Sequence, residues 1–173
     1  MDSVDFAEYV ANRQRTLLRF AMVLCGDERR AEDIVADVLG RAYEQWGRIG
    51  RMDRAHAYVR RMVVNEFLSG KRRERRLVPL EELHDAAVDD HSGPYAERAA
   101  LLARLATLPP KQRAALALRY YEDLADAEIA ATLRCSVGTV RSNISRALAT
   151  LRVEAREPES GDEHVAVLTT KES

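Results

Sequence analysis

The sequence predicts an all-α protein: two small helical domains joined by a flexible acidic linker, the second of them ending in a helix-turn-helix. Apolar residues recur at helical spacing along most of the 173 residues, whereas the alternation typical of strands is scarcely visible. The five prolines and eight glycines fall mostly between these periodic segments. With 46% hydrophobic and 32% charged residues, the chain has the composition of a globular protein with an apolar core.

The first predicted helix begins after Asp5, which fits a capping box together with Glu8. Apolar side chains then recur at helical steps as far as Gly26, a residue typical of the C-terminal end of a helix, so we expect about 20 helical residues. Asp27 follows directly and is expected to cap the second helix.

The second predicted helix carries the strongest apolar stripe of the chain, within residues 31–46, and Gly47 is expected to end it. Its opposite face is charged, at a spacing that also stabilises an ordinary solvated helix. The charged residues of this face are Glu32, Asp33, Asp37, Arg41 and Glu44. From the residues alone, a binding surface and a solvated face are equally open.

A third helix is predicted after Asp53, which can cap it. One side of this helix is apolar, with Tyr58 and Phe67 among its residues, and the other is basic. Gly70 then precedes the run KRRERR, so that residues 59–76 hold seven Lys or Arg against two Glu. A basic surface with aromatic residues in between suits a nucleic-acid strand, although a solvated helix end has the same composition.

Residues 77–93 lack helical periodicity and are rich in Asp and Glu, which predicts a flexible acidic linker. Its stretch HDAAVDDH, residues 84–91, contains metal-binding residue types, but a flexible linker cannot hold ligands in a fixed geometry, and we expect no metal site. The last residues are polar and acidic, which predicts a disordered tail. The predicted organisation is an N-terminal domain at 1–76, the linker at 77–93, a C-terminal domain at 94–155 and the tail at 156–173.

The C-terminal domain is predicted to begin with two helices that each have a proline in the first turn, Pro94 and Pro110. The apolar residues of the first of these helices are expected to face inward, and those of the second to pack on the helix-turn-helix. They are Leu101, Leu102 and Leu105 in the first helix, and Ala114, Leu118 and Tyr121 in the second.

Residues 124–152 contain two periodic segments separated by a tight turn, as in a helix-turn-helix. Asp126 is expected to cap the first helix and Ser136 the second. Arg134 stands where the turn usually has glycine, which predicts backbone strain or shifted boundaries.

The second helix of this unit is apolar on one face and polar on the other, and residues 137–152 contain three Arg but no Asp or Glu. The residues predicted to face outward are Thr139, Ser142, Asn143 and Arg146, with Arg141 at the flank. Such a helix can enter the major groove of DNA, although an ordinary amphipathic helix has a similar pattern.

Several classes of protein are disfavoured. Cys25 and Cys135 lie far apart without metal-binding spacing, which indicates reduced thiols in a cytoplasmic protein. The first residues, MDSVDF, are acidic where a signal peptide is basic, and no apolar run approaches the roughly 18 residues of a membrane span, so we expect no membrane insertion. The sequence offers no Ser/His/Asp or Cys/His constellation and no glycine-rich phosphate loop, so we expect neither an enzyme nor a cofactor.

This order of segments resembles an extracytoplasmic-function sigma factor of bacterial RNA polymerase, of the SigE-like type of actinobacteria. The resemblance covers nearly all of residues 6–152. Its more specific motifs are AEDIVADVLGRAYEQW at 31–46, LPPKQR at 108–113 and SVGTVRSNISRA at 136–147. It implies a protein that binds core polymerase, reads the minus-35 and minus-10 elements of a promoter and assists in melting the DNA. In this family an anti-sigma factor that clamps both domains holds many members inactive, and the flexible linker predicted here would permit such a partner to wrap around both domains.

The resemblance assigns roles to three sets of residues. In the family the second helix docks on the polymerase clamp, which implicates Glu32, Asp33, Asp37 and Arg41. The third helix and the loop after it read the minus-10 element, which implicates Arg60, Arg61, Asn65, Lys71, Arg72, Arg73, Arg75 and Arg76. The last helix reads the minus-35 element, which implicates Arg141, Ser142, Ser145 and Arg146, with Thr139 and Asn143 on the same face. Lys111, Arg113 and Arg119 are expected either to contact phosphates or to form structural salt bridges.

Two other interpretations fit part of the sequence. A dimeric regulator with a C-terminal helix-turn-helix and a sensory N-terminal half would bind an operator without polymerase. An adaptor whose charged faces bind only proteins would support no promoter-dependent transcription. Run-off transcription with core polymerase and a promoter library separates both from a sigma factor.

Overall fold

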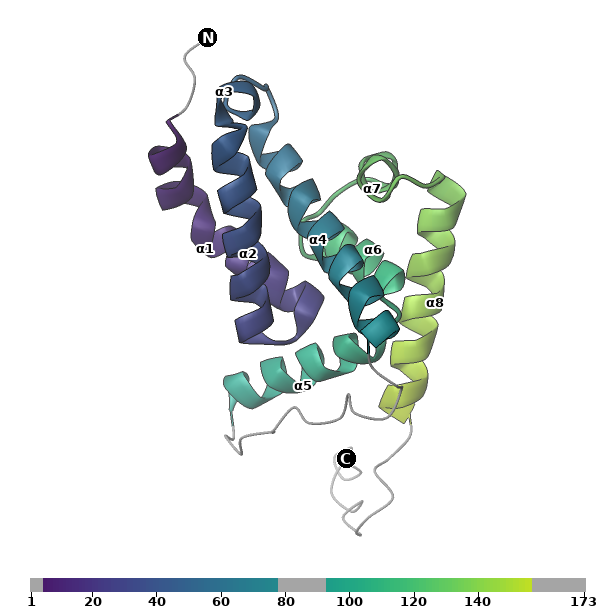
Figure 1. Ribbon diagram of the computed structural model, residues 1–173. Helices are drawn as coiled ribbons and strands as arrows, with labels where there is room; N and C mark the ends of the chain where they lie inside the picture. Colours follow the sequence, from purple (N-terminus) through teal and green to yellow (C-terminus); the bar gives the residue numbers. More distant parts are fainter. Residues whose placement is uncertain (1–4, 78–92, 157–173) are drawn as a thin grey trace, which may run out of the picture.

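A computed structural model describes the chain over residues 5–77 and 93–156, and all secondary structure in these two ranges is helical (Figure 1). The helices are α1 (Phe6–Cys25), α2 (Glu28–Glu44), α3 (Trp46–Ile49), α4 (Ala55–Leu77), α5 (Pro94–Thr107), α6 (Pro110–Tyr120), α7 (Asp126–Leu133) and α8 (Val137–Arg156). The predicted all-α fold is confirmed. Most of the predicted linker, including its HDAAVDDH stretch, and the tail after residue 156 lie outside the described residues.

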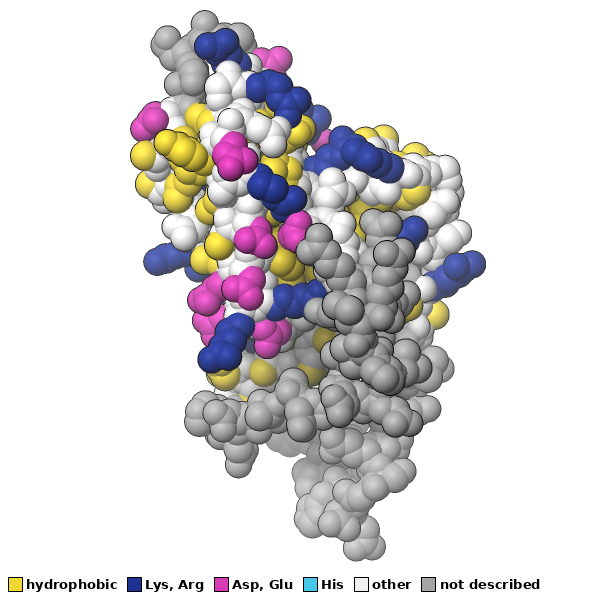
Figure 2. All heavy atoms as spheres, viewed as in Figure 1, with side chains coloured by type: hydrophobic (Ala, Val, Ile, Leu, Met, Phe, Trp, Pro, Cys, Tyr) yellow, Lys and Arg dark blue, Asp and Glu magenta, His cyan; other side chains and the backbone are white. Residues whose placement is uncertain are grey.

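The junction between α1 and α2 follows the local signals of the sequence. Gly26 adopts the left-handed conformation, with φ of 70°, and its N–H donates to the Met22 carbonyl at 2.8 Å. The Asp27 carboxylate accepts from the Arg30 amide at 2.8 Å, as expected of an N-cap. α2 then buries its apolar stripe, whereas acidic side chains gather on its exposed face (Figure 2).

Some predicted boundaries are wrong. Asp5 is the N-cap residue of α1, and its carbonyl accepts the first helical hydrogen bond, from the Tyr9 amide, but its side chain makes no capping hydrogen bond. Gly47 does not end the second helix: α2 stops at Glu44, and Gly47 lies within the one-turn helix α3. Trp46 explains this turn, since its ring is 7% exposed and packs against Tyr9 with 4.8 Å between ring centroids. α4 begins at Ala55, two residues after Asp53, and continues through Gly70.

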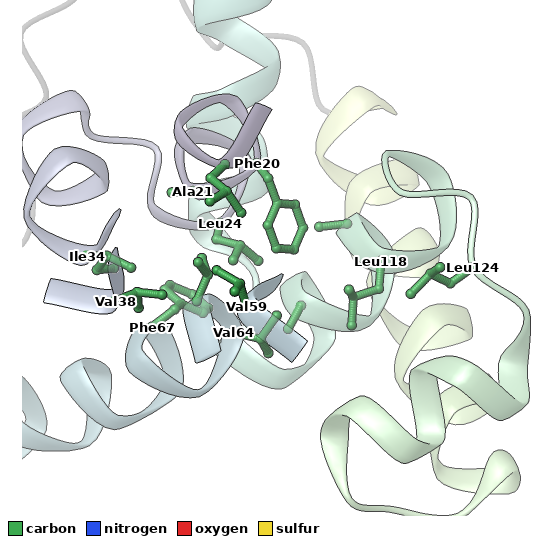
Figure 3. Close-up of a cluster of buried hydrophobic side chains, with 14 of the residues drawn as sticks. Phe20, Ala21, Leu24, Ile34, Val38, Val59, Val64, Phe67, Leu118 and Leu124 are labelled. Atoms are coloured by element: carbon green, nitrogen blue, oxygen red, sulfur yellow. The ribbon is translucent and has the colours of Figure 1, made fainter. Parts of the chain in front are cut away.

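One hydrophobic core spans the helices on both sides of the undescribed segment 78–92. Phe20 of α1, Phe67 of α4 and Leu118 of α6 are all fully buried within it (Figure 3). Burial of a side chain of this size stabilises the fold by about 1.5–3 kcal/mol. α6 therefore belongs to the same packed interior as α1 and α4.

Of the remaining C-terminal helices, α7 and α8 pack on α6. α7 packs on α8 and also contacts α4, while α5 contacts α1 and α8. α5 has no buried residue, and Leu101 is 51% exposed, so the expectation that Leu101 faces inward is wrong. Leu102 and Leu105 are half-buried. Tyr121 also departs from its expected packing on α7 and α8, because its ring is 43% exposed and stacks on Phe20 of α1.

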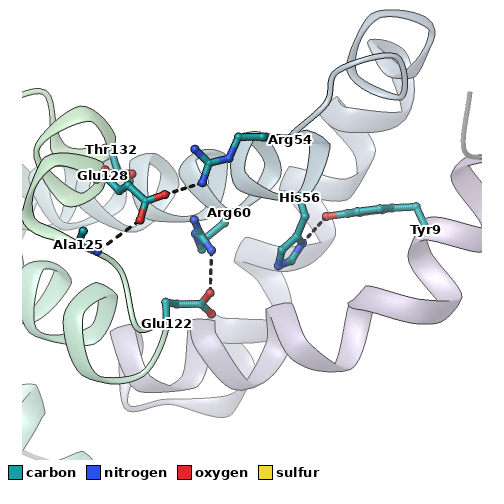
Figure 4. A network of polar contacts seen from close by, with 8 residues as sticks. All are labelled: Tyr9, Arg54, His56, Arg60, Glu122, Ala125, Glu128 and Thr132. Carbon is teal, nitrogen blue, oxygen red and sulfur yellow. Dashed lines mark hydrogen bonds and ion pairs between the residues drawn. The ribbon is translucent and has the colours of Figure 1, made fainter. Parts of the chain in front are cut away.

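A half-buried histidine gives the fold a specific pH dependence. The Tyr9 hydroxyl lies 3.0 Å from His56 Nδ1 (Figure 4). Burial, with the charges of Arg13 and Arg60 acting in the same direction, lowers the pKa of His56 to about 4. As the pH falls below 6.5, the ordinary pKa of histidine, His56 becomes protonated in the unfolded chain but stays neutral in the folded chain. The stability present above pH 6.5 is therefore lost between about pH 6.5 and 4.

We expect the substitution His56→Gln to weaken this pH dependence. Urea unfolding at several pH values should show that the free energy of unfolding falls less steeply between pH 6.5 and 4 in the variant than in the unchanged protein. Above pH 7 the two curves should run parallel. Equal slopes in the acidic range would contradict the lowered pKa of His56.

Candidate nucleic-acid and protein interfaces

The exposed face of α2 is a candidate surface for a protein partner. Glu32, Asp33, Asp37, Arg41 and Glu44 are all exposed on it, as the helical spacing predicted. Arg41 also reaches α4, where its Nη2 lies 2.6 Å from Glu66 Oε2. The ion pair with Glu66 neutralises the positive charge of Arg41. The rest of this face is acidic, which suits a basic partner.

α4 carries the residues predicted to meet the minus-10 element, but one of them is engaged within the protein. Arg60 Nη1 lies 2.9 Å from Glu122 Oε2, and each side chain is 11% exposed (Figure 4). Arg61 is half-buried and Asn65 is exposed. The other predicted residues, Lys71, Arg72, Arg73, Arg75 and Arg76, lie in the last turns of α4, where the structure describes the backbone alone.

A second ion pair joins the same two parts of the chain. Arg54, just before α4, lies 2.5 Å from Glu128 of α7, and Glu128 also accepts from the Ala125 amide at 3.3 Å (Figure 4). The hydrogen bond from Arg54 is the main reason that the pKa of Glu128 is lowered, followed by the bond from Ala125. Arg54 and Arg60 thus both meet carboxylates of the C-terminal half.

Arg113 has a structural role in this packing, although its partners are backbone carbonyls and not the phosphates or salt-bridge partners that were the two roles expected for it. Its side chain is 3% exposed and donates to three backbone carbonyls: Leu24 at 2.8 Å, Leu108 at 3.1 Å and Ala106 at 2.5 Å. Its guanidinium carbon lies 5.6 Å from the centre of the Phe67 ring. Burial lowers the pKa of Arg113 to about 10. One side chain of α6 therefore joins α1, α4 and the turn between α5 and α6.

The helix-turn-helix is formed by α7 and α8. Ser136 caps α8 as predicted, since its Oγ accepts from the Thr139 amide at 3.1 Å. Arg134 adopts the left-handed conformation, with φ of 53°, as expected for a residue in place of a turn glycine.

Asp126 does not cap α7, because it is the first residue of the helix and its carboxylate binds two arginines. Arg119 forms an ion pair with it, and Arg141 Nε donates to it at 3.0 Å. Arg119 is therefore engaged in a structural salt bridge, one of the two roles expected for it. Lys111 is exposed.

The outer face of α8 is a candidate DNA-reading surface. Val140, Ile144 and Ala147 are buried on its inner side. Thr139, Arg141, Ser142, Ser145 and Arg146 are exposed and Asn143 is half-buried, so the predicted minus-35 residues share one accessible side. Arginine and amide side chains on a helix can form paired hydrogen bonds with base edges in the major groove. The interaction of Arg141 with Asp126 additionally orients its guanidinium.

The two candidate DNA-binding helices lie beside the same hollow. A hollow of about 650 Å³ is lined by Asn65 and Ser69 of α4 together with Arg134 of the turn and Asn143 of α8. The proximity of these residues could not be predicted from the sequence, because they meet only through long-range packing. The buried role of Arg113 did have a local signal, since Leu116 and Ala117 lie on its helical face.

These features define a class of protein. A fold of packed helices that presents, from a helix-turn-helix, a polar helix face without Asp or Glu over residues 137–152 is that of a helical DNA-binding protein. Within residues 5–77 and 93–156, every helix is too short or too polar to cross a bilayer.

The comparisons with known proteins identify the family. "Sigma-70 region 2" matches residues 9–77 and "Sigma-70, region 4" matches residues 98–151. The chain is 43% identical to the RNA polymerase sigma-E factor of Streptomyces avermitilis over 152 residues, which cover 87% of this chain and 85% of that protein. It is 31% identical to the ECF RNA polymerase sigma factor SigL of Mycobacterium tuberculosis over 147 residues, or 82% and 83% of the two chains.

A solved structure is also similar. The sigma factor RpoE of Bartonella quintana, crystallised in complex with the anti-sigma factor NepR, has a TM-score of 0.71 and 25% identity, over 88% of this chain and 99% of that one. The chain belongs to the extracytoplasmic-function sigma factors of RNA polymerase, and its relatives among them include sigma-E factors of Streptomyces. As a sigma factor it directs promoter-specific initiation of transcription.

Proposed function

We propose that this sigma factor binds core RNA polymerase through the acidic face of α2, reads the minus-10 element with α4 and reads the minus-35 element with α8. The observation that carries the proposal is the exposed face of α8, which has no Asp or Glu over residues 137–152 and is held in place by its buried inner side. Residues 1–76 would form the polymerase-binding and minus-10 domain, and residues 94–155 the minus-35 domain. Holding the opened strand on basic α4 would offset the few kcal/mol lost when its bases unstack.

Residues 5–77 and residues 93–156, the two halves of the protein, pack closely around one core, and we infer that they separate during function. The minus-35 and minus-10 elements are about 25 base pairs apart, or about 85 Å at 3.4 Å per base pair. α8, with its 20 residues, is about 30 Å long and borders the same hollow as α4. Two helices this close cannot occupy both elements at once. Separation would also free Arg60 from Glu122, so that a phosphate could replace the carboxylate as its partner.

The proposed partners follow from this function. They are core RNA polymerase and promoter DNA, and an anti-sigma factor is a further proposed partner, in line with the complex known for the Bartonella relative. We infer that the protein acts in the cytoplasm, where bacterial polymerase meets its template. We also propose that it catalyses no reaction itself, since positioning polymerase at a promoter requires only binding.

Recognition of the minus-35 element predicts a specific defect in two variants. We expect Arg141→Ala or Arg146→Ala to weaken promoter binding by the holoenzyme by about 1–3 kcal/mol, or about 5- to 150-fold, because each removes a donor pair for a base edge. Fluorescence anisotropy with a labelled promoter fragment measures the loss. Run-off transcription from a library of minus-35 sequences then shows whether base preference is relaxed at one position.

A matched control is Arg15→Ala, which removes the same charge from an exposed position on α1. It should leave affinity and base preference unchanged. An unchanged minus-35 preference in both α8 variants would contradict the proposed reading surface. Specific binding to an operator without polymerase would favour the dimeric regulator instead.

A further inference from the structure

An open apolar groove lies between the two halves of the protein. It has a volume of about 560 Å³ and is formed by α1, α5, α6 and α8. Its walls consist mainly of Leu101, Leu102, Leu105, Leu116, Leu148 and Leu151. Arg19 of α1 and Arg98 of α5 also line it, and neither forms an ion pair with a described residue. The groove has no part in the proposed contacts with polymerase or DNA.

Apolar side chains of this region remain exposed, which favours the binding of an apolar occupant. Leu101 is 51% exposed and Tyr120 is 64% exposed, although both line a concave apolar surface. Exposed apolar surface of this kind costs about 25 cal/mol per Å² relative to burial. α5 contributes no buried residue to the core of the protein. An occupant of the groove would therefore stabilise α5 in particular.

The chain contains a segment that matches the groove in chemistry. Val165, Ala166, Val167 and Leu168 are four consecutive apolar residues. The residues just before them, 157–164, include four acids, Glu157, Glu159, Asp162 and Glu163, and no Lys or Arg. Apolar residues preceded by acids are complementary to leucine walls beside two arginines.

The chain geometry also allows this match. α8 lines the groove with Leu148 and Leu151 and ends at Arg156, so the chain leaves the helix about 12 Å beyond Leu148. Eight residues lie between Arg156 and Val165, and the nine Cα-to-Cα steps from one to the other can span up to about 30 Å. It can therefore fold back along α8. Because the segment is tethered, its effective concentration at the groove is in the millimolar range, so even weak apolar contacts suffice.

We propose that residues 165–168 bind in the groove between α1, α5, α6 and α8, with the preceding acids beside Arg19 and Arg98. A tail bound there contacts both halves of the chain, because α1 belongs to one and α5 to the other. It would thus favour the closed packing, a consequence that rests on the proposed function in which the halves separate.

A photo-crosslink in the full-length chain tests the proposal without polymerase or DNA, so its failure is distinct from failure of the proposed function. Leu101 is replaced by p-benzoylphenylalanine, the protein is irradiated at low micromolar concentration, and crosslinked peptides are mapped by mass spectrometry. We expect crosslinks within one molecule to residues 157–173. The triple substitution V165D/V167D/L168D should abolish them. The same probe in place of Tyr43, which is 67% exposed on α2, is the matched control and should not reach the tail.

The other outcomes would overturn the proposal. Crosslinks from position 101 to residues 78–92 would identify the linker as the occupant of the groove. Crosslinked dimers would identify a second copy of the chain as the occupant. Equal tail crosslinks from positions 101 and 43 would indicate random collisions. Hydrogen exchange serves as the second measurement, with both proteins carrying Leu101 unchanged: α5 amides should exchange several-fold faster in V165D/V167D/L168D than in the unchanged chain. Unchanged α5 protection would refute tail binding.

Discussion

Reversing the charges of Asp33 and Asp37 together is expected to abolish the complex with core RNA polymerase. The two acids lie four residues apart on the exposed face of α2, so both can meet one basic surface. Close charge pairs across an interface have coupling energies of about 1.5–7 kcal/mol. Repulsion in D33K/D37K should therefore cost at least about 3 kcal/mol, or more than about 100-fold in affinity. Co-migration with core polymerase on a sizing column and a fluorescence titration measure the loss.

Two further variants make this result specific to the acidic face. D33N/D37N removes the charges without reversing them and should give an intermediate affinity, with a weaker dependence on salt. D5K/E8K makes the same change of charge at the start of α1 and should bind core polymerase normally. A complex that D33K/D37K leaves intact would remove α2 as the polymerase-binding helix.

Arg113→Met is expected to lower the free energy of unfolding by about 2–4 kcal/mol. Methionine fills part of the volume and keeps the contact with Phe67, but it leaves the carbonyls of Leu24, Ala106 and Leu108 without their donor in a buried site. Urea unfolding followed by circular dichroism measures the change. Arg113→Lys should retain part of the stability, because one ammonium group cannot reproduce the planar set of donors.

The control for this prediction is Arg15→Met, a substitution at an exposed position that should change the free energy of unfolding by less than about 0.5 kcal/mol. If Arg113→Met lowers the free energy of unfolding no more than this control does, the three hydrogen bonds of Arg113 do not hold α6 against α1. Hydrogen exchange in α1 and α6 of the same variant then locates the loss, which we expect at the contact between these helices.

Local signals made much of the fold predictable from the sequence. Gly26 ends α1, Asp27 and Ser136 cap the helices that follow them, and Pro94 and Pro110 open α5 and α6. Each of these effects depends on residues within one turn of the chain. The same holds for the outer face of α8, whose residues follow directly from the helical period.

Contacts between distant residues could not be predicted in the same way. Arg60 meets Glu122, and Asp126 meets Arg119 and Arg141, only because the helices pack in a particular arrangement. Asp126 has the residue type of a cap, yet the arginines beside it determine its role. Arg113 was similarly assigned from its charge, whereas its burial depends on α1 and α4.

The core shared by Phe20, Phe67 and Leu118 makes the closed form sensitive to temperature. Separating α4 from α6 would bring apolar surface into water, and the free energy that opposes this is mainly entropic near 25 °C. It therefore weakens on cooling and strengthens on moderate warming. In the free protein, cooling should therefore increase the fraction of molecules whose two halves are separated. Polymerase would then encounter fewer molecules in the closed form.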